Sequence, residues 1–141
     1  MKKNKYTFIS LFFIIIIIGL LFLLNQYNKP SVDVTNLDAD LVINVDEILK
    51  DFQKDEEKAN LKYTNNIIEV HGEISKISTV DGNATITLKD NQFDSNVICN
   101  VQPQENKEVL QLKKGDQISL KGICTGYLLD VILVKCVIEN N

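Results

Sequence analysis

The longest apolar stretch of the chain lies close to its amino terminus. Residues 6–24 contain no charged residue and no proline. A helix of this length spans roughly 28 Å, close to the thickness of a bilayer's hydrocarbon core. The next residues, 25–29, offer no small-x-small cleavage site and no cysteine for lipid attachment. The pattern therefore predicts an uncleaved transmembrane anchor, with a cleaved signal peptide as the alternative.

Basic residues flank this segment unequally. Three lysines and the free amino terminus precede it, and only Lys29 lies close behind it. The positive-inside rule then places residues 1–5 in the cytoplasm and exports the rest of the chain. Residues 25–37 are mostly polar and include Pro30, which predicts a short stalk.

A helical pattern follows the stalk. Asn44 is suited to cap the helix, and Glu47 completes a capping box. Apolar residues then recur at helical spacing on an otherwise charged segment, which predicts one amphipathic helix. Its apolar stripe consists of Val45, Ile48, Leu49, Phe52, Ala59 and Tyr63. Residues 64–66, Thr-Asn-Asn, are expected to end it.

Beyond residue 66 the period changes to two, which predicts five strands separated by turns and one short helix. Asp-Gly within residues 80–83 is a hairpin signal, residues 90–94 form a second turn, and residues 104–112 are expected to be helical. The predicted inward faces are Ile68, Val70, Gly72 and Ile74, then Ala84, Ile86 and Leu88, then Val97, Cys99 and Val101, then Ile118, Leu120, Gly122 and Cys124, and finally Ile132, Val134, Cys136 and Ile138.

This element order predicts a mainly β domain with an N-terminal helix. Three strands, a short helix and a final hairpin fit a five-stranded Greek-key barrel of the oligonucleotide/oligosaccharide-binding (OB) type. Gly72 in the first strand fits too, because short barrel strands must bend sharply. An open α+β sheet is the alternative. The expected organisation is a cytoplasmic end at 1–5, an anchor at 6–24, a stalk at 25–37 and the domain at 38–139.

The charge of the exported part argues against nucleic acid as its ligand. All 19 acidic residues follow the anchor, against 12 of the 15 lysines, and the chain contains no arginine. The resulting formal charge of −7 repels a polyanion, whereas nucleic-acid binders carry clustered basic residues. The second and third predicted strands also lack aromatic residues on which bases could stack.

The outward face of those two strands is where OB barrels usually bind ligands. Its hydroxyl and amide groups could hydrogen-bond a sugar or a peptide backbone, and one apolar residue stands among them. An ordinary solvated strand face is the competing interpretation. The candidate ligand-binding residues are Thr85, Thr87, Lys89, Asn96, Ile98 and Asn100.

No catalytic or metal centre is predicted. His71, the single histidine, lies between Glu69 and Glu73 on its strand without an evident nucleophile. The three cysteines form no CxxC pair, so neither a zinc site nor another cofactor is expected. Because disulfides persist outside the cytoplasm, one bridge with one free thiol and three buried thiols both stay open. The cysteines are Cys99, Cys124 and Cys136.

Spaced core residues and glycines across residues 38–139 resemble the tRNA_anti-like family of small exported bacterial OB-fold proteins. The matching positions are Phe52, Asp55, Glu56, Ala59, Lys62, Tyr63, Val70-His71-Gly72-Glu73-Ile74, Ile77, Val97, Cys99, Leu112, Gly115-Asp116, Gly122, Cys124, Gly126, Leu133 and Cys136. The resemblance implies the fold and a place in the cell envelope, but no ligand.

The expected function is that of a membrane-anchored, extracytoplasmic and non-enzymatic binding module for an envelope protein, glycan or peptide. The alternative is a structural accessory subunit of an envelope membrane complex. That alternative predicts an exposed apolar patch that includes Ile98, Ile123 or Val137.

Overall fold

The computed structural model describes residues 14–21 and 33–139. Residues 14–21 form a helix with exposed apolar side chains. Within these two described ranges, no helix is long and apolar enough to cross a membrane. The rest of the predicted anchor lies outside the described residues, as do the predicted cytoplasmic end and residues 25–32 of the predicted stalk.

A compact unit begins at Asp33. Val34 is fully buried in it, so the last part of the predicted stalk packs against the domain.

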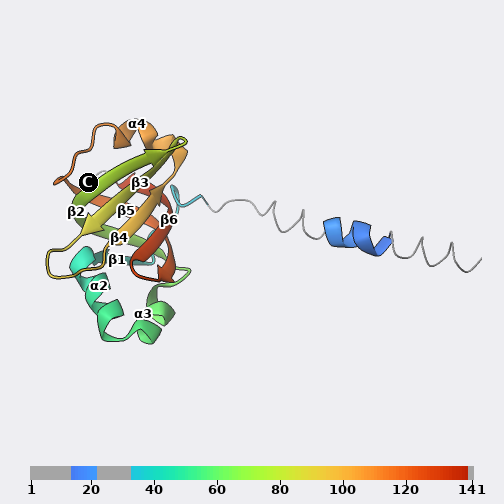
Figure 1. Cartoon of the computed structure of the whole chain (residues 1–141), viewed down its shortest axis with the longest axis horizontal. Helices are drawn as coiled ribbons and strands as arrows, with labels where there is room; N and C mark the ends of the chain where they lie inside the picture. Colours follow the sequence, from blue (N-terminus) through green and yellow to red (C-terminus); the bar gives the residue numbers. More distant parts are fainter. Residues whose placement is uncertain (1–13, 22–32, 140–141) are drawn as a thin grey trace, which may run out of the picture. The chain divides into compact units, whose positions relative to one another are not determined.

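Five strands of this unit close into a barrel, shown in Figure 1. The sheet order is β2-β3-β4-β6-β5, and β5 pairs back onto β2. All neighbours are antiparallel except β4 and β6, which run parallel. The prediction of a closed five-stranded barrel is confirmed, and the open sheet is wrong. The strands are β2 (Ile67–Val80), β3 (Asn83–Lys89), β4 (Val97–Val101), β5 (Gln117–Tyr127) and β6 (Val131–Glu139).

Short elements cover the two ends of the barrel (Figure 1). At one end lie α2 (Val45–Lys54) and α3 (Glu56–Tyr63), and at the other η1 (Pro103–Glu105) and α4 (Asn106–Val109). The sequence pattern did not reveal β1 (Leu41–Asn44), which pairs in parallel with β2 ahead of α2.

The single predicted helix is two helices. Asp55, with φ −160° and ψ 88°, interrupts it between α2 and α3. Its Oδ1 accepts a hydrogen bond from the Lys58 backbone N–H at 3.1 Å, so Asp55 caps α3. At the start of α2, the Glu47 carboxylate accepts from the Asn44 backbone N–H at 3.4 Å, as the predicted capping box requires.

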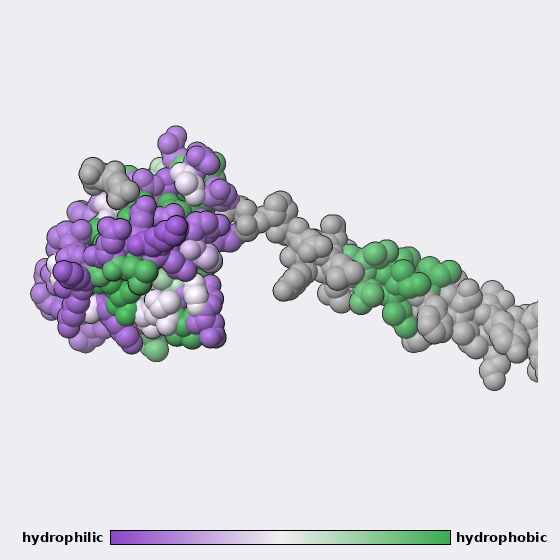
Figure 2. Space-filling view, turned by 90° about the horizontal axis from the view of Figure 1, so that it is seen from above, coloured by the Kyte–Doolittle hydropathy of each residue, from purple (hydrophilic) through white to green (hydrophobic). Residues whose placement is uncertain are grey.

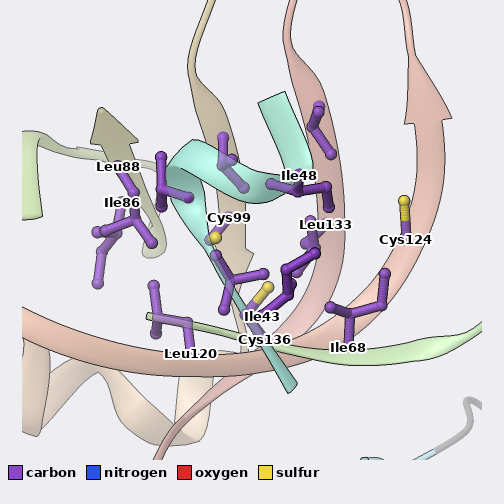
Figure 3. Packing of buried hydrophobic residues seen from close by; sticks show 14 of the residues in the cluster. Ile43, Ile48, Ile68, Ile86, Leu88, Cys99, Leu120, Cys124, Leu133 and Cys136 are labelled. Carbon is purple, nitrogen blue, oxygen red and sulfur yellow. The ribbon is translucent and has the colours of Figure 1, made fainter. Parts of the chain in front are cut away.

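The predicted inward faces of β2, β3 and β4 fill one core, part of which Figure 3 shows. Most of their members are fully buried, although Gly72 is half-buried. A side chain at Gly72 would overlap Val45 of α2. The glycine therefore admits the first turn of α2 onto the sheet, in addition to any bend of the strand.

The predicted inward face of β6 is partly wrong. Val131 and Leu133 are fully buried, whereas Ile132 and Val134 are half-buried. Lys135 has φ +55°, and the pairing of β6 with β4 and β5 shifts around it. This bulge inserts one residue and exchanges the two faces of the strand. Beyond the bulge, Cys136 points into the core as predicted.

The three cysteines are free thiols buried in the barrel. Figure 3 shows Cys99 of β4, Cys124 of β5 and Cys136 of β6 among the apolar side chains of the core. In this structure the cysteines are therefore three buried thiols, without the single bridge that was the other possibility.

Candidate functional site

The predicted ligand face is the outer surface of β3 and β4. Thr85 lies opposite Asn100, and Thr87 lies opposite Ile98. The Thr85 hydroxyl donates to the Asn100 side-chain oxygen at 3.1 Å. These four side chains stand together and are half-buried or exposed. The alternation of β3 and β4 predicted this arrangement.

The two other predicted residues lie at the margin of this face. Lys89 ends β3, opposite Glu73 of β2. Asn96 precedes β4 and binds Asp130 of the β5–β6 turn, through its backbone N–H at 2.7 Å and its side-chain amide at 3.1 Å. Asn96 therefore joins two turns, and its amide is less free to meet a ligand.

The face continues onto β6 with apolar residues that sequence reasoning placed in the core. Ile132 lies beside Ile98, and Val134 lies opposite Ile123 of β5. All four are half-buried. We call these four residues the isoleucine-rich strip. An exposed apolar patch was expected to include Ile98, Ile123 or Val137. Ile98 and Ile123 are half-buried members of the strip, whereas Val137 is buried.

A second candidate surface is a groove of about 770 Å³ between α3 and β5. The α3 wall extends from Glu56 to Asn65 and presents carboxylates, amides and one leucine. The β5 wall is the segment Thr125–Tyr127. We call the hollow between these two walls the α3–β5 groove. Figure 2 shows that hydrophobic patches interrupt the mainly hydrophilic surface of the domain. Because the two walls of the groove lie far apart in the sequence, no local pattern predicted it.

Polar and aromatic contacts fix the helical wall of the groove. The Tyr63 hydroxyl donates to Asp51 Oδ2 at 2.6 Å, and Lys62 Nζ lies 2.9 Å from the same oxygen. The hydrogen bond from Tyr63, followed by that from Lys62, lowers the pKa of Asp51. Phe52 of α2 stacks on Tyr127 of β5 with ring centroids 5.2 Å apart. Phe52, Lys62 and Tyr63 thus hold α2, α3 and β5 together. All three are among the positions that match the tRNA_anti-like pattern.

A polar cluster lies on the outer side of β2 and β5. His71 Nδ1 contacts the Ser119 hydroxyl, and His71 Nε2 lies 3.5 Å from Glu69 Oε1. The buried Lys121 pairs with Glu139. The sequence pattern revealed no nucleophile beside His71, because Ser119 is far from it along the chain. The two residues meet where β5 pairs with β2. Among the described residues, no group of three His, Cys, Asp or Glu side chains is arranged to hold a metal ion.

Comparison with known proteins identifies the family of this fold. The model of the tRNA_anti-like family matches residues 1–138. The chain belongs to the tRNA_anti-like family. This confirms the resemblance, and the match begins at residue 1, so that it includes the segment of the predicted anchor. No curated protein matches the chain.

Solved structures resemble this tRNA_anti-like chain to different degrees. One is described as a "putative nucleic acid-binding lipoprotein" from Klebsiella pneumoniae, with 19% identity and a TM-score of 0.59. The match covers 79% of this chain and 100% of that one. The Stn1–Ten1 complex of S. pombe is more distant, with 16% identity, a TM-score of 0.42, and 53% of this chain and 59% of that chain covered. At 19% identity the likeness to the Klebsiella protein extends to the fold alone.

Proposed function

We propose that this tRNA_anti-like protein is a membrane-anchored, extracytoplasmic and non-enzymatic binding module. Its contact surface is the outer face of β3 and β4 together with the isoleucine-rich strip. The observation that carries the proposal is the pairing of Thr85 with Asn100 beside Ile98 and Ile132. Polar groups able to orient a ligand adjoin an apolar surface able to bind one, as in protein-binding sites.

The shape of this face favours a macromolecular partner. It is a sheet surface, and the groove described above lies between α3 and β5 instead. A hollow of about 220 Å³ touches the face only at its margin, where Lys89 lines it. Small ligands usually bind in concave sites that bury most of their surface. A protein or an extended peptide can instead cover a flat face.

A structural accessory subunit is the second candidate, and the isoleucine-rich strip favours it. Four half-buried β-branched residues on adjacent strands form a surface suited to permanent docking. The two candidates differ in how long the partner stays bound. A binding module releases its partner, whereas an accessory subunit copurifies with one partner in a fixed ratio.

Charge weighs against nucleic acid. The described domain carries 19 acidic residues and 11 lysines. Lys76, Lys89 and Lys135 border the proposed face, and no arginine accompanies them. The threonines, asparagine, isoleucines and valine of the face provide no stacking platform for bases. The description of the Klebsiella relative therefore does not extend to this chain on physical grounds.

The neighbourhood of Ser119 supports a non-enzymatic role. Although His71 contacts its hydroxyl, Ser119 lies inside the sheet between His71 of β2 and Glu139 of β6. Strand pairing on both sides engages the backbone of Ser119 itself. An acyl-transfer site needs free donors directed at the developing oxyanion, and a strand paired on both sides is a poor source of them.

Export and anchoring rest on the apolar run at 6–24 and on the lysines ahead of it. Protease added to intact cells tests them on a full-length chain with a C-terminal epitope tag. Loss of the tag without lysis, with the protein sedimenting in the membrane fraction, is the expected result. A tag that survives until the cells are lysed contradicts export.

Binding to labelled oligo-dT and oligo-U tests the exclusion of nucleic acid. No change in fluorescence anisotropy is expected at physiological salt. Saturable binding that weakens as salt increases would instead assign the protein to nucleic acid.

A further inference from the structure

The α3–β5 groove has features of a docking site that the proposed face does not supply. We propose that the groove binds a segment of a partner protein that inserts an apolar side chain and places a lysine or arginine beside Glu56 and Glu57. This inference rests on the proposed function as an interaction module, and it adds a second surface with a defined partner chemistry.

One exposed leucine lines the groove, and two more follow its β5 wall. Leu61 in its α3 wall is 81% exposed. Leu128 and Leu129 directly follow the β5 wall in the β5–β6 turn and are 81% and 79% exposed. Three leucines with so little cover represent apolar surface that a partner can remove from water.

The acidic side chains of the groove are available to a cation. Glu56 and Glu57 are exposed, and neither forms an ion pair within residues 33–139. The neighbouring aspartates are instead neutralised by ion pairs, Asp55 with Lys58 and Asp51 with Lys62. The groove therefore combines apolar walls with unneutralised negative charge, and it is complementary to an apolar segment that carries a basic residue.

The groove is preformed. Thr64 hydrogen-bonds Asn60 at 3.3 Å, and the Asn65 backbone N–H donates to the Cys124 carbonyl at 2.8 Å. Gly126 has φ +116°, and a Cβ there would lie 3.2 Å from Asn60 Oδ1. The bare backbone of β5 thus allows α3 to approach closely. A preformed site loses less entropy on binding, because its walls are already ordered.

Charge selects a partner protein over the other occupants of an apolar groove. The carboxylates of Glu56 and Glu57 repel anionic lipid head groups at short range. They also repel a second copy of this acidic domain, in which 19 acidic residues outnumber 11 lysines. A basic and apolar protein segment meets neither obstacle.

Selection of binding peptides tests this proposal on the full-length chain, purified in detergent and immobilised. The probe is a phage-displayed library of random peptides. The groove variants are Leu128→Asp and Glu57→Lys. Their matched controls are Leu110→Asp and Glu108→Lys at α4, where the leucine is 84% exposed and the glutamate is exposed. All four sites face solvent, so melting temperatures are expected to stay close to that of the wild type.

Enriched peptides are expected to combine an apolar residue with an adjacent lysine or arginine. Each groove variant is expected to weaken them by about tenfold or more, and each control to leave affinity unchanged. Peptides without a basic residue, or peptides indifferent to Leu128→Asp and Glu57→Lys, would overturn the proposal. So would dimerisation or vesicle binding that Leu128→Asp abolishes, since either would assign another occupant.

The same selection separates this proposal from the function on which it rests. Peptides that lose affinity only in Ile98→Asp would refute the groove and leave the binding module standing. A selection that enriches no peptide would count against both.

Discussion

Gly122 of β5 packs so closely on Cys136 of β6 that a Cβ at position 122 would lie 2.5 Å from the Cys136 Sγ. The same Cβ would lie 3.0 Å from the Val134 carbonyl oxygen. The two strands therefore meet beside the Lys135 bulge only because residue 122 has no side chain.

Gly122→Ala is expected to lower the free energy of unfolding by about 1–3 kcal/mol, because the added methyl overpacks the barrel. In a Cys136→Ala background the same change is expected to cost less, since the sulfur that it meets is gone. Urea unfolding of the fragment that begins at Asp33 measures both costs. Equal costs in the two backgrounds would show that the close contact does not limit the packing.

The hydrogen bond between Tyr63 and Asp51 is expected to make part of the domain's stability sensitive to acid. The hydrogen bond from Tyr63, followed by that from Lys62, lowers the pKa of Asp51 below its ordinary value of 3.8. A carboxyl group with a lowered folded pKa stabilises the fold above its unfolded pKa, and this stabilisation is lost as the pH falls through the folded pKa.

Wild type is therefore expected to lose more stability than Tyr63→Phe between about pH 5 and about pH 2. The phenylalanine keeps the buried ring and removes only the hydroxyl donor. Thermal unfolding across this pH range provides the comparison. Parallel profiles for the two proteins would indicate that the Asp51 carboxylate gains nothing from Tyr63.

Lys135 adopts a backbone conformation that glycine occupies more readily. Its φ of +55° costs an L-residue roughly 1 kcal/mol. Lys135→Gly is expected to be neutral or to stabilise the domain, and Lys135→Val to destabilise it, because a branched Cβ aggravates the same strain. Urea unfolding measures the free energy of unfolding of both variants. A valine variant more stable than the glycine variant would rule out a left-handed bulge at this position.

The bulge also explains which part of the fold eluded prediction. Strand alternation located β3 and β4 and the polar pairs of their outer face, because neither strand is interrupted. In β6 the same rule gave the wrong face for Ile132 and Val134, since no glycine or proline marks the extra residue at Lys135. The break at Asp55 did have a signal, because aspartate followed by two glutamates is typical of a helix start.

Other features depend on contacts between distant segments. β1 contains only four residues and is ordered by pairing with β2. The α3–β5 groove and the His71–Ser119 contact each join elements that close the barrel from opposite parts of the chain. Periodicity describes one segment at a time and cannot identify such neighbours.

The buried thiols are expected to be unreactive in the folded protein. The hydrogen bond with Cys99, followed by burial, raises the pKa of Cys136, and burial raises that of Cys124. Because the thiolate is the nucleophile, iodoacetamide should modify none of the three native cysteines and all three in urea. Mass spectrometry counts the adducts. A single adduct in urea without reductant would instead reveal a disulfide.

Ser119 is expected not to act as a nucleophile. A fluorophosphonate probe should leave it unlabelled, because its own backbone is paired on both sides and supplies no free donor to the developing oxyanion. Peptide mass spectrometry after incubation of the full-length chain provides the measurement. Labelling of Ser119 that His71→Ala abolishes would show an activated serine and contradict the non-enzymatic proposal.

The most direct test of the account is crosslinking in intact cells, followed by mass spectrometry of the proteins that copurify with the full-length chain. Wild type and Ile98→Asp are compared, with Leu110→Asp as the matched control of equal charge change. The expected result is a defined partner that Leu110→Asp retains and Ile98→Asp loses. A partner profile that Ile98→Asp leaves unchanged would contradict the outer face of β3 and β4 as the contact surface.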